Sequence, residues 1–267
     1  MKAIFYIMFV GFLAFHLMGC QNQSGSDPSG NTVDGWLALA GDASYGSDQW
    51  IAMLDSAILN FPNEAEPYYR KAVRLIRQDD YLGGMQNLTK AAELNPLAYL
   101  NYLGLIKLMD LHDFEGAATA FQKAITLGAY NDPIISGNAK LRLGLTLKEM
   151  GKFDEAISNI TEYINENGEE HVIVYTFIHR GTAYEAIGDF ELAASDYEKA
   201  LSYWPKCTEA YYFLGKLKLA IGEAAAACQN ARNAILYKNF IRTNPSRSYT
   251  DQIYYTDLEA LFDAACQ

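Results

Sequence analysis

The chain has little proline and no block of basic residues. Its 267 residues include only 7 prolines and 20 glycines, and 21 Lys and Arg stand against 32 Asp and Glu, for a formal net charge of −11. The low proline and glycine content argues against a low-complexity chain. Contact along a phosphate backbone needs clustered Lys and Arg, so we expect no nucleic-acid partner.

The sequence also lacks the short motifs that hold metals, phosphates or catalytic nucleophiles. There is no His-x-x-x-His or Cys-x-x-Cys spacing, no Gly-x-Ser-x-Gly elbow and no phosphate-binding glycine motif. His112, His171 and His179 are scattered, and a metal needs more ligands close by than His171 and His179 supply. Acid pairs such as Asp79-Asp80 fit solvated turns better than general acid/base catalysis. We therefore expect no enzyme, no cofactor and no metal.

The first twenty residues read as a targeting segment. Lys2 supplies a positive start, an apolar run follows from Ile4 to Phe15, and Leu17-Met18-Gly19-Cys20 resembles a bacterial lipobox. This resemblance implies that residues 1–19 are a lipoprotein signal peptide and that Cys20 is lipidated. Acyl chains would then hold the protein on a membrane surface. The alternative is a plain signal peptide followed by a chance cysteine.

Residues 20–35 are rich in Ser, Gly and Asn and read as a flexible tether after the lipidated cysteine. Lipoproteins that stay in the inner membrane often carry Asp directly after the cysteine, whereas this chain has Gln21. By that resemblance we expect a place in the bacterial cell envelope, at the outer membrane and facing the periplasm.

The rest of the chain shows helical periodicity throughout. Apolar residues recur every three or four positions, and no strand alternation of any length appears. Residues 177–205 carry the most regular pattern, in which two helical faces flank a Gly-Asp turn. That stretch resembles a tetratricopeptide repeat (TPR) in Phe177, Gly181, Tyr184, Ala193, Tyr197, Ala200 and Pro205. Arg180 departs from the usual Leu.

Five further units of similar length resemble the same repeat. They cover residues 31–64, which are degenerate, and residues 65–97, 98–135, 137–172 and 208–240. The resemblance implies an all-α, right-handed solenoid of about six TPR hairpins over residues 36–240. Gly104 lies one place early, so an altered first helix or turn is expected in its unit. Residues 241–267 read as a C-terminal capping helix, since Asp251 to Cys266 is amphipathic.

Three cysteines follow Cys20. Cys207 and Cys228 start opposite helices of the last hairpin and should lie far apart, whereas a capping helix that runs back along the second helix brings Cys266 towards Cys228. We predict a Cys228–Cys266 disulfide. The alternative is three buried thiols.

In TPR proteins the first helices of successive hairpins line a concave groove. The matching repeat positions in this chain are Tyr69, Val73, Tyr99, Tyr102, Asn138, Leu141, Leu145, Tyr175, Ile178, Thr182, Tyr212 and Lys216, with Ile76, Lys148, Glu185 and Glu209 beside them. Tyr69 and Val73 replace the Lys and Asn of grooves that clamp a terminal carboxylate. The resemblance thus implies a protein or peptide partner with an extended or helical apolar segment. Alternatively, the tyrosines fill the interior of the superhelix.

Two hypotheses for the function follow. The first is a membrane-anchored scaffold or adaptor that holds another envelope protein in its groove. The second is a structural assembly or pilotin-like factor that acts through self-association or through an outer-membrane secretion or pilus machine. An enzyme and a glycan-binding protein have less support, since no catalytic constellation is found and tyrosines recur at core positions of the repeat.

Overall fold

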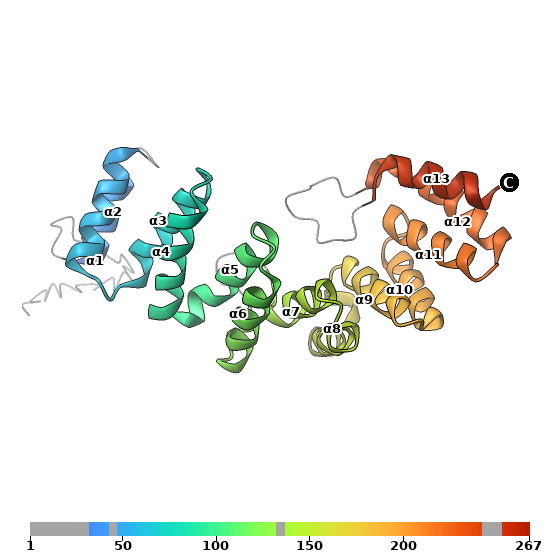
Figure 1. The fold of residues 1–267 in the computed structure, drawn as a ribbon, viewed down its shortest axis with the longest axis horizontal. Helices are drawn as coiled ribbons and strands as arrows, with labels where there is room; N and C mark the ends of the chain where they lie inside the picture. Colours follow the sequence, from blue (N-terminus) through green and yellow to red (C-terminus); the bar gives the residue numbers. More distant parts are fainter. Residues whose placement is uncertain (1–31, 43–46, 132–136, 242–252) are drawn as a thin grey trace, which may run out of the picture.

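A computed structural model of the protein describes residues 32–42, 47–131, 137–241 and 253–267. The predicted signal peptide and Cys20 lie outside these residues. The regular elements of the described part are helices, beside one isolated bridge between Asn131 and Asn138. The predicted all-α solenoid is thereby confirmed. The helices follow one another in sequence order along an arc that ends at α13 (Figure 1).

The helices of the described residues form six hairpins and a final single helix. The hairpins are α1 (Val33–Asp42) with α2 (Asp48–Asn60), α3 (Ala65–Ile76) with α4 (Tyr81–Leu94), α5 (Pro96–Met109) with α6 (Phe114–Thr126), α7 (Ala139–Glu149) with α8 (Phe153–Asn167), α9 (Tyr175–Ala186) with α10 (Phe190–Tyr203), and α11 (Thr208–Ala220) with α12 (Ala224–Leu236). Two short 3-10 helices, η1 (Glu169–His171) and η2 (Lys238–Phe240), follow α8 and α12, and α13 (Tyr255–Ala265) closes the array. Because α1 begins at Val33, the last residues of the expected tether are helical.

Each hairpin packs on its neighbours in the sequence, and the buried side chains form a series of clusters along the solenoid. Its largest fully buried side chains include Leu88, Phe121, Ile160, Phe177 and Tyr197, which come from four successive hairpins. The first hairpin contributes a much smaller cluster around Leu37, Trp50 and Leu54. This agrees with its degenerate sequence, because a terminal repeat has a neighbour on one side only.

The hairpins close tightly because a small residue of the first helix faces a large one of the second. A Cβ atom added at Gly181 would lie 2.6 Å from Cε1 of Tyr197, and one at Gly144 would lie 2.6 Å from Cγ1 of Ile160. Gly104 faces Phe121 in the same way, at 2.7 Å. Gly104 is therefore in register with its partner helix, and α5 itself is regular.

The irregularity of the third unit lies in its turn. The first residue of the second helix comes ten residues after Gly104 at Phe114, but nine after Gly181 at Phe190. The longer turn places His112 in the left-handed region with φ 51°, whereas the α9–α10 turn uses Gly188 with φ 83°. The predicted alteration is thus a one-residue insertion between the helices.

The last helix covers the open face of the sixth hairpin. Leu261 and Ala265 of α13 pack with Ala227 and Ala231 of α12, and Leu258 joins the main core. The helix starts later than predicted, at Tyr255, where the Asp257 carboxylate accepts a hydrogen bond from the Tyr254 backbone N–H at 2.6 Å. Asp251, the predicted start, lies outside the described residues.

Candidate functional site

From α5 to α11, the first helices of successive hairpins lie closer together than the second helices do. α5 contacts α7, α7 contacts α9 and α9 contacts α11, whereas the second helices of the described hairpins lack neighbouring contacts of comparable extent. In a curved array the elements on the inside of the bend approach each other most closely. The inner face of the first helices is therefore the candidate site.

Tyrosines occupy this inner face near the N-terminal end. The ring of Tyr69 on α3 stacks on Tyr99 of α5 with centroids 4.8 Å apart, and meets Tyr102 edge-on at 5.6 Å. The Tyr99 hydroxyl donates a hydrogen bond to the Glu66 carboxylate. Burial and that carboxylate raise the pKa of Tyr99, so the phenol stays protonated. Tyr69, Tyr102 and the neighbouring Val73 remain half-buried and can meet a ligand.

Polar contacts link the inner face further along the chain. Lys148 Nζ on α7 lies 3.3 Å from Thr182 Oγ1 on α9, and Lys216 Nζ on α11 lies 3.3 Å from Glu185 Oε1 on α9. The hydroxyl of Tyr197 also donates to Glu185, at 3.0 Å. This part of the face is a chain of charged and hydroxyl groups. The expectation from the sequence, a partner with an apolar segment, fits the N-terminal part of the face better than this part.

The remaining predicted groove residues differ in their exposure. Leu141, Leu145 and Ile178 belong to the buried core, while Tyr212 is half-buried and packs edge-on against Phe213 at 5.2 Å. Asn138 is buried at the N-terminus of α7, where its Oδ1 accepts a hydrogen bond from the Lys140 backbone N–H at 2.8 Å. Its side chain caps the helix.

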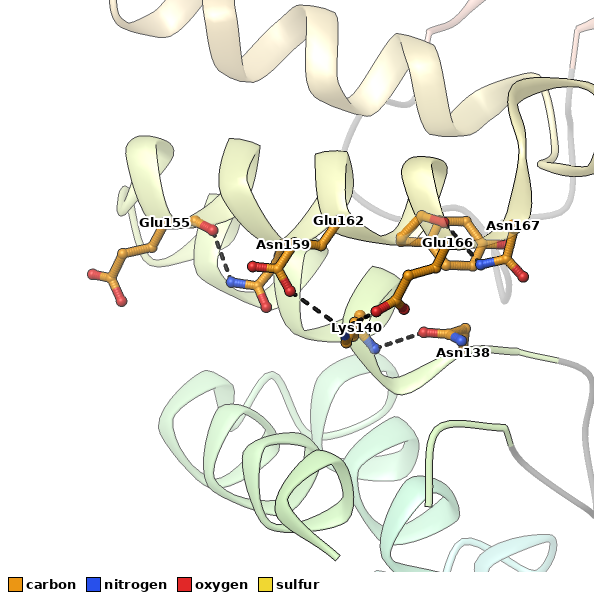
Figure 2. Close-up of polar contacts among 8 residues, drawn as sticks. Asn138, Lys140, Glu155, Asn159, Glu162, Glu166 and Asn167 are labelled. Carbon is orange, nitrogen blue, oxygen red and sulfur yellow. Dashed lines mark hydrogen bonds and ion pairs between the residues drawn. The ribbon is translucent and has the colours of Figure 1, made fainter. Parts of the chain in front are cut away.

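Lys140 itself holds the fourth hairpin together (Figure 2). Its ammonium group hydrogen-bonds to Glu166 and lies 3.3 Å from Glu162, both on α8, and sits 5.5 Å from the ring of Tyr130. The hydrogen bond to Glu166 raises the pKa of Lys140. Lys140 therefore links the loop after α6 to α7 and α8. Its positive charge is paired with groups of the same chain.

An apolar pocket of about 560 Å³ lies at the edge of the solenoid, where second helices end and the next first helices begin. Its lining residues come from three such junctions: Val172, Ile173, Val174, Tyr175, Trp204 and Phe240. The Trp204 ring stands 6.3 Å from Tyr175 and 6.3 Å from Phe240. The groove positions of the repeat omit all of these residues except Tyr175, whose hydroxyl donates to Glu209 at 3.3 Å. Their only signal in the sequence is apolar residues placed between helices.

Cys228 and Cys266 form a disulfide between α12 and the end of α13, with their Cα atoms 4.8 Å apart. Cys207 is a buried free thiol whose Sγ lies 3.8 Å from Glu209 Oε2. Burial and the Glu209 charge raise the pKa of Cys207 to about 12. A thiol in this state is a poor nucleophile.

Neither a metal site nor a membrane-spanning helix is found in the part of the chain that the structure describes. No group of three or more His, Cys, Asp or Glu side chains there could hold a metal ion. None of the described helices has the length and hydropathy needed to cross a bilayer.

Sequence comparisons identify the repeat. Profiles described as "Tetratricopeptide repeat" match residues 138–169 and 179–235. A human protein, Tetratricopeptide repeat protein 12, is 30% identical over 108 residues, which are 39% of this chain. The chain spans 14% of the length of that relative.

Solved structures of other TPR proteins share the fold. PilW, described as a widely conserved type IV pilus biogenesis factor, aligns with 80% of this chain and 96% of its own at a TM-score of 0.58 and 18% identity. YrrB, described as a TPR protein with an unusual peptide-binding site, aligns with 72% of this chain and 95% of its own at a TM-score of 0.55 and 19% identity. MamA aligns with 63% of this chain and 94% of its own at a TM-score of 0.55 and 19% identity. The chain therefore carries tetratricopeptide repeats, and its fold is the TPR solenoid.

Proposed function

We propose that the protein is a lipid-anchored scaffold of the bacterial envelope that binds a segment of a partner protein along the inner face of its first helices. The observation that carries this proposal is the half-exposed tyrosine cluster of Tyr69 and Tyr102, which is open beside the stacked and buried Tyr99. Aromatic side chains that remain accessible on a rigid helical surface provide contact area at little entropic cost. The peptide-binding site of YrrB, on a solenoid of the same fold, supports such a use.

The inner face has two chemically different parts, which restricts the partner. The tyrosine cluster suits apolar side chains, whereas Thr182, Glu185 and Lys216 offer groups that form directional hydrogen bonds. The partner segment should therefore be amphipathic, with its apolar end towards α3 and α5 and its polar end towards α9 and α11.

Capture of envelope proteins on the immobilised full chain tests this proposal. Tyr102→Ala combined with Lys216→Ala should lower recovery of a partner that binds the wild-type chain. Leu59→Ser combined with Leu82→Ser is a matched control, because these side chains are 82% and 75% exposed and lie away from the inner face. Equal recovery on the groove variant and the control would exclude the inner face as the binding surface.

The lipid anchor has its own test. Incorporation of radiolabelled palmitate in a bacterial host should be lost in a Cys20→Ser variant, which should also leave the membrane fraction. If the wild-type chain takes up no label and is recovered outside the membrane fraction, the anchoring part of the proposal is wrong, whatever the result for the inner face.

The second candidate is an assembly or pilotin-like factor that acts through self-association or an outer-membrane machine. It is favoured by the similarity to PilW over 96% of that chain. Light scattering on the purified full chain distinguishes the two. A stable homo-oligomer that blocks partner capture supports the assembly factor, and a monomer that captures a partner supports the scaffold.

A further inference from the structure

We propose that the apolar pocket at the solenoid edge is a second docking site, which takes an apolar anchor side chain from an acidic peptide segment. The pocket is separate from the inner face, and Tyr175 is the one residue that belongs to both. The edge pocket and the inner face can therefore be tested separately.

The pocket leaves large apolar side chains open to solvent. Ile173 is 53% exposed and Phe240 is 43% exposed, although both line the same concavity. Exposed apolar side chains that meet in one concavity can receive an apolar group from a partner, and this contact removes both surfaces from water. The concavity has a volume of about 560 Å³ and is open to solvent, so it can seat one apolar side chain without enclosing a whole ligand.

The walls of the pocket are held in place before any ligand arrives. Trp204 stands between Tyr175 and Phe240, with both ring centroids 6.3 Å away. The η2 helix that carries Phe240 is fixed because the Thr208 hydroxyl donates to the Tyr237 carbonyl at 2.6 Å. A pocket that exists before binding spares the ligand the cost of ordering it.

The rim beside Phe240 is positively charged. Lys206 Nζ lies 5.3 Å from the Phe240 ring centroid, and Lys238, in the same 3-10 helix as Phe240, lies with its Nζ 5.9 Å from the Tyr255 ring. Neither lysine forms an ion pair with a carboxylate of the described residues. In a chain of net charge −11, this is a local excess of positive charge.

Two acidic residues near the pocket, Glu169 and Glu209, are already engaged. Glu169 pairs with Lys199 at 2.6 Å, whereas Glu170 is exposed and lies 3.4 Å from His171, which carries a charge only when protonated. Glu209 is buried and accepts the hydrogen bond from Tyr175. Beside Phe240, the charges left to meet a ligand are those of the two lysines. A segment that carries an aromatic or aliphatic anchor next to Asp or Glu matches both the pocket and its rim.

A peptide library tests the proposal. Short peptides with a fixed central Phe or Leu and flanks drawn from Glu, Lys and Ser are selected on the immobilised full chain. We expect enrichment of acidic flanks, and an affinity that falls as salt is raised, because exposed charges are screened. No enrichment, or equal enrichment of basic flanks, would overturn the proposal.

Variants then assign the binding to the pocket. Ile173→Asn with Phe240→Ser should weaken the enriched peptide at least about tenfold, which corresponds to about 1.4 kcal/mol. Lys206→Glu with Lys238→Glu should reverse the preference towards basic flanks. All four side chains are exposed, so circular dichroism should show an unchanged fold.

Two controls separate this proposal from the groove proposal. Leu59→Ser with Leu82→Ser removes equally exposed apolar side chains elsewhere and should leave the peptide affinity unchanged. Tyr102→Ala with Lys216→Ala alters the inner face and should also leave it unchanged. Loss of binding in this groove variant, with retention in the pocket variant, would overturn the edge site and leave the groove proposal standing.

Discussion

Arg180 and Asp196 form a two-point ion pair between α9 and α10, with Nε 2.8 Å from Oδ2 and Nη2 2.7 Å from Oδ1. Arg180 Nη1 also donates to Thr161 Oγ1 on α8 at 3.1 Å, so one side chain joins three helices. Arg180 stands where the repeat usually has Leu, and the departure is compensated by a buried carboxylate.

Replacing Arg180 alone should therefore destabilise the folded protein. Arg180→Leu leaves Asp196 buried without its partner and should destabilise the protein by roughly 3 kcal/mol, measured by thermal and urea unfolding. Arg180→Leu combined with Asp196→Leu should recover much of that loss, because an apolar pair needs no desolvation of charge. If the double variant is as unstable as the single variant, the Arg180–Asp196 pair stabilises the protein by more than the mutual neutralisation of its two charges.

The same variant should respond to pH. Burial raises the pKa of Asp196 above its ordinary value, and removal of Arg180 takes away an opposing influence. A carboxyl whose folded pKa is raised binds protons more tightly in the folded state, so folding is weakened as the pH rises through that window. The deficit of Arg180→Leu should shrink as the pH falls from the raised folded pKa towards 3.8, and an unfolding series across that range measures it.

Gly181 should not tolerate a methyl group. A Cβ atom there would lie 2.6 Å from the Tyr197 ring, so Gly181→Ala should destabilise by about 1–3 kcal/mol, even though Ala is the better helix former. Tyr197→Leu in the same chain should offset part of this cost. A double-mutant cycle measured by urea unfolding reports the coupling, and strict additivity would argue against a steric cause.

His112 is strained in the left-handed region, where the turns after α7, α9 and α11 have glycine. Because His112 has φ 51°, His112→Gly should stabilise the protein by up to about 1 kcal/mol, since a non-glycine residue in the left-handed region costs roughly that much. Gly188→Ala, at φ 83°, is the reverse change in the α9–α10 turn and should destabilise by a similar amount. Melting temperatures of both variants provide the comparison, and a loss of stability in His112→Gly would contradict it.

The Cys228–Cys266 disulfide should fasten the end of the solenoid. Its ends are 38 residues apart, and the chain-entropy relation gives about 4 kcal/mol for a loop of that length. Reduction, or Cys228→Ser with Cys266→Ser, should expose α13 to amide hydrogen exchange before the central helices. A thiol assay on denatured protein should gain two thiols when reductant is added, and an unchanged count would refute the bond.

Asp113 should contribute to acid sensitivity. The Lys107 ammonium and the Gly116 N–H lower its pKa below the ordinary 3.8. For a carboxyl with a lowered folded pKa, the added stability is complete above the ordinary value and is lost as the pH falls through the folded pKa. Asp113→Asn should therefore reduce the loss of stability below pH 3.8, measured by acid unfolding. An unaltered acid profile would assign the effect to other carboxylates.

The solenoid could be predicted because the repeat has small and large residues at the fixed positions where its two helices pack. Gly181 against Tyr197 is visible in the sequence as a spacing, and so is Gly144 against Ile160. The spacing of the third unit predicts an irregularity but not the turn insertion at His112, since a displaced glycine fits an altered helix or an altered turn equally well.

The candidate sites were harder to predict. Repeat positions place Leu141 and Ile178 on the inner face, but how far they are buried depends on how closely neighbouring first helices approach, and the repeat pattern does not encode that distance. No sequence pattern predicts the edge pocket. Ile173, Trp204 and Phe240 lie in connections of different length, and only the three-dimensional stacking of junctions brings them together.

The two ends of the helical array are held with different strength. The first hairpin rests on the small cluster of Leu37, Trp50 and Leu54, whereas the last is clamped by α13 and a covalent bond. In a chain whose units touch only their neighbours, loss of order spreads from the weaker terminus. Fraying should therefore start at α1 and α2 and proceed, one hairpin after another, towards the clamped end.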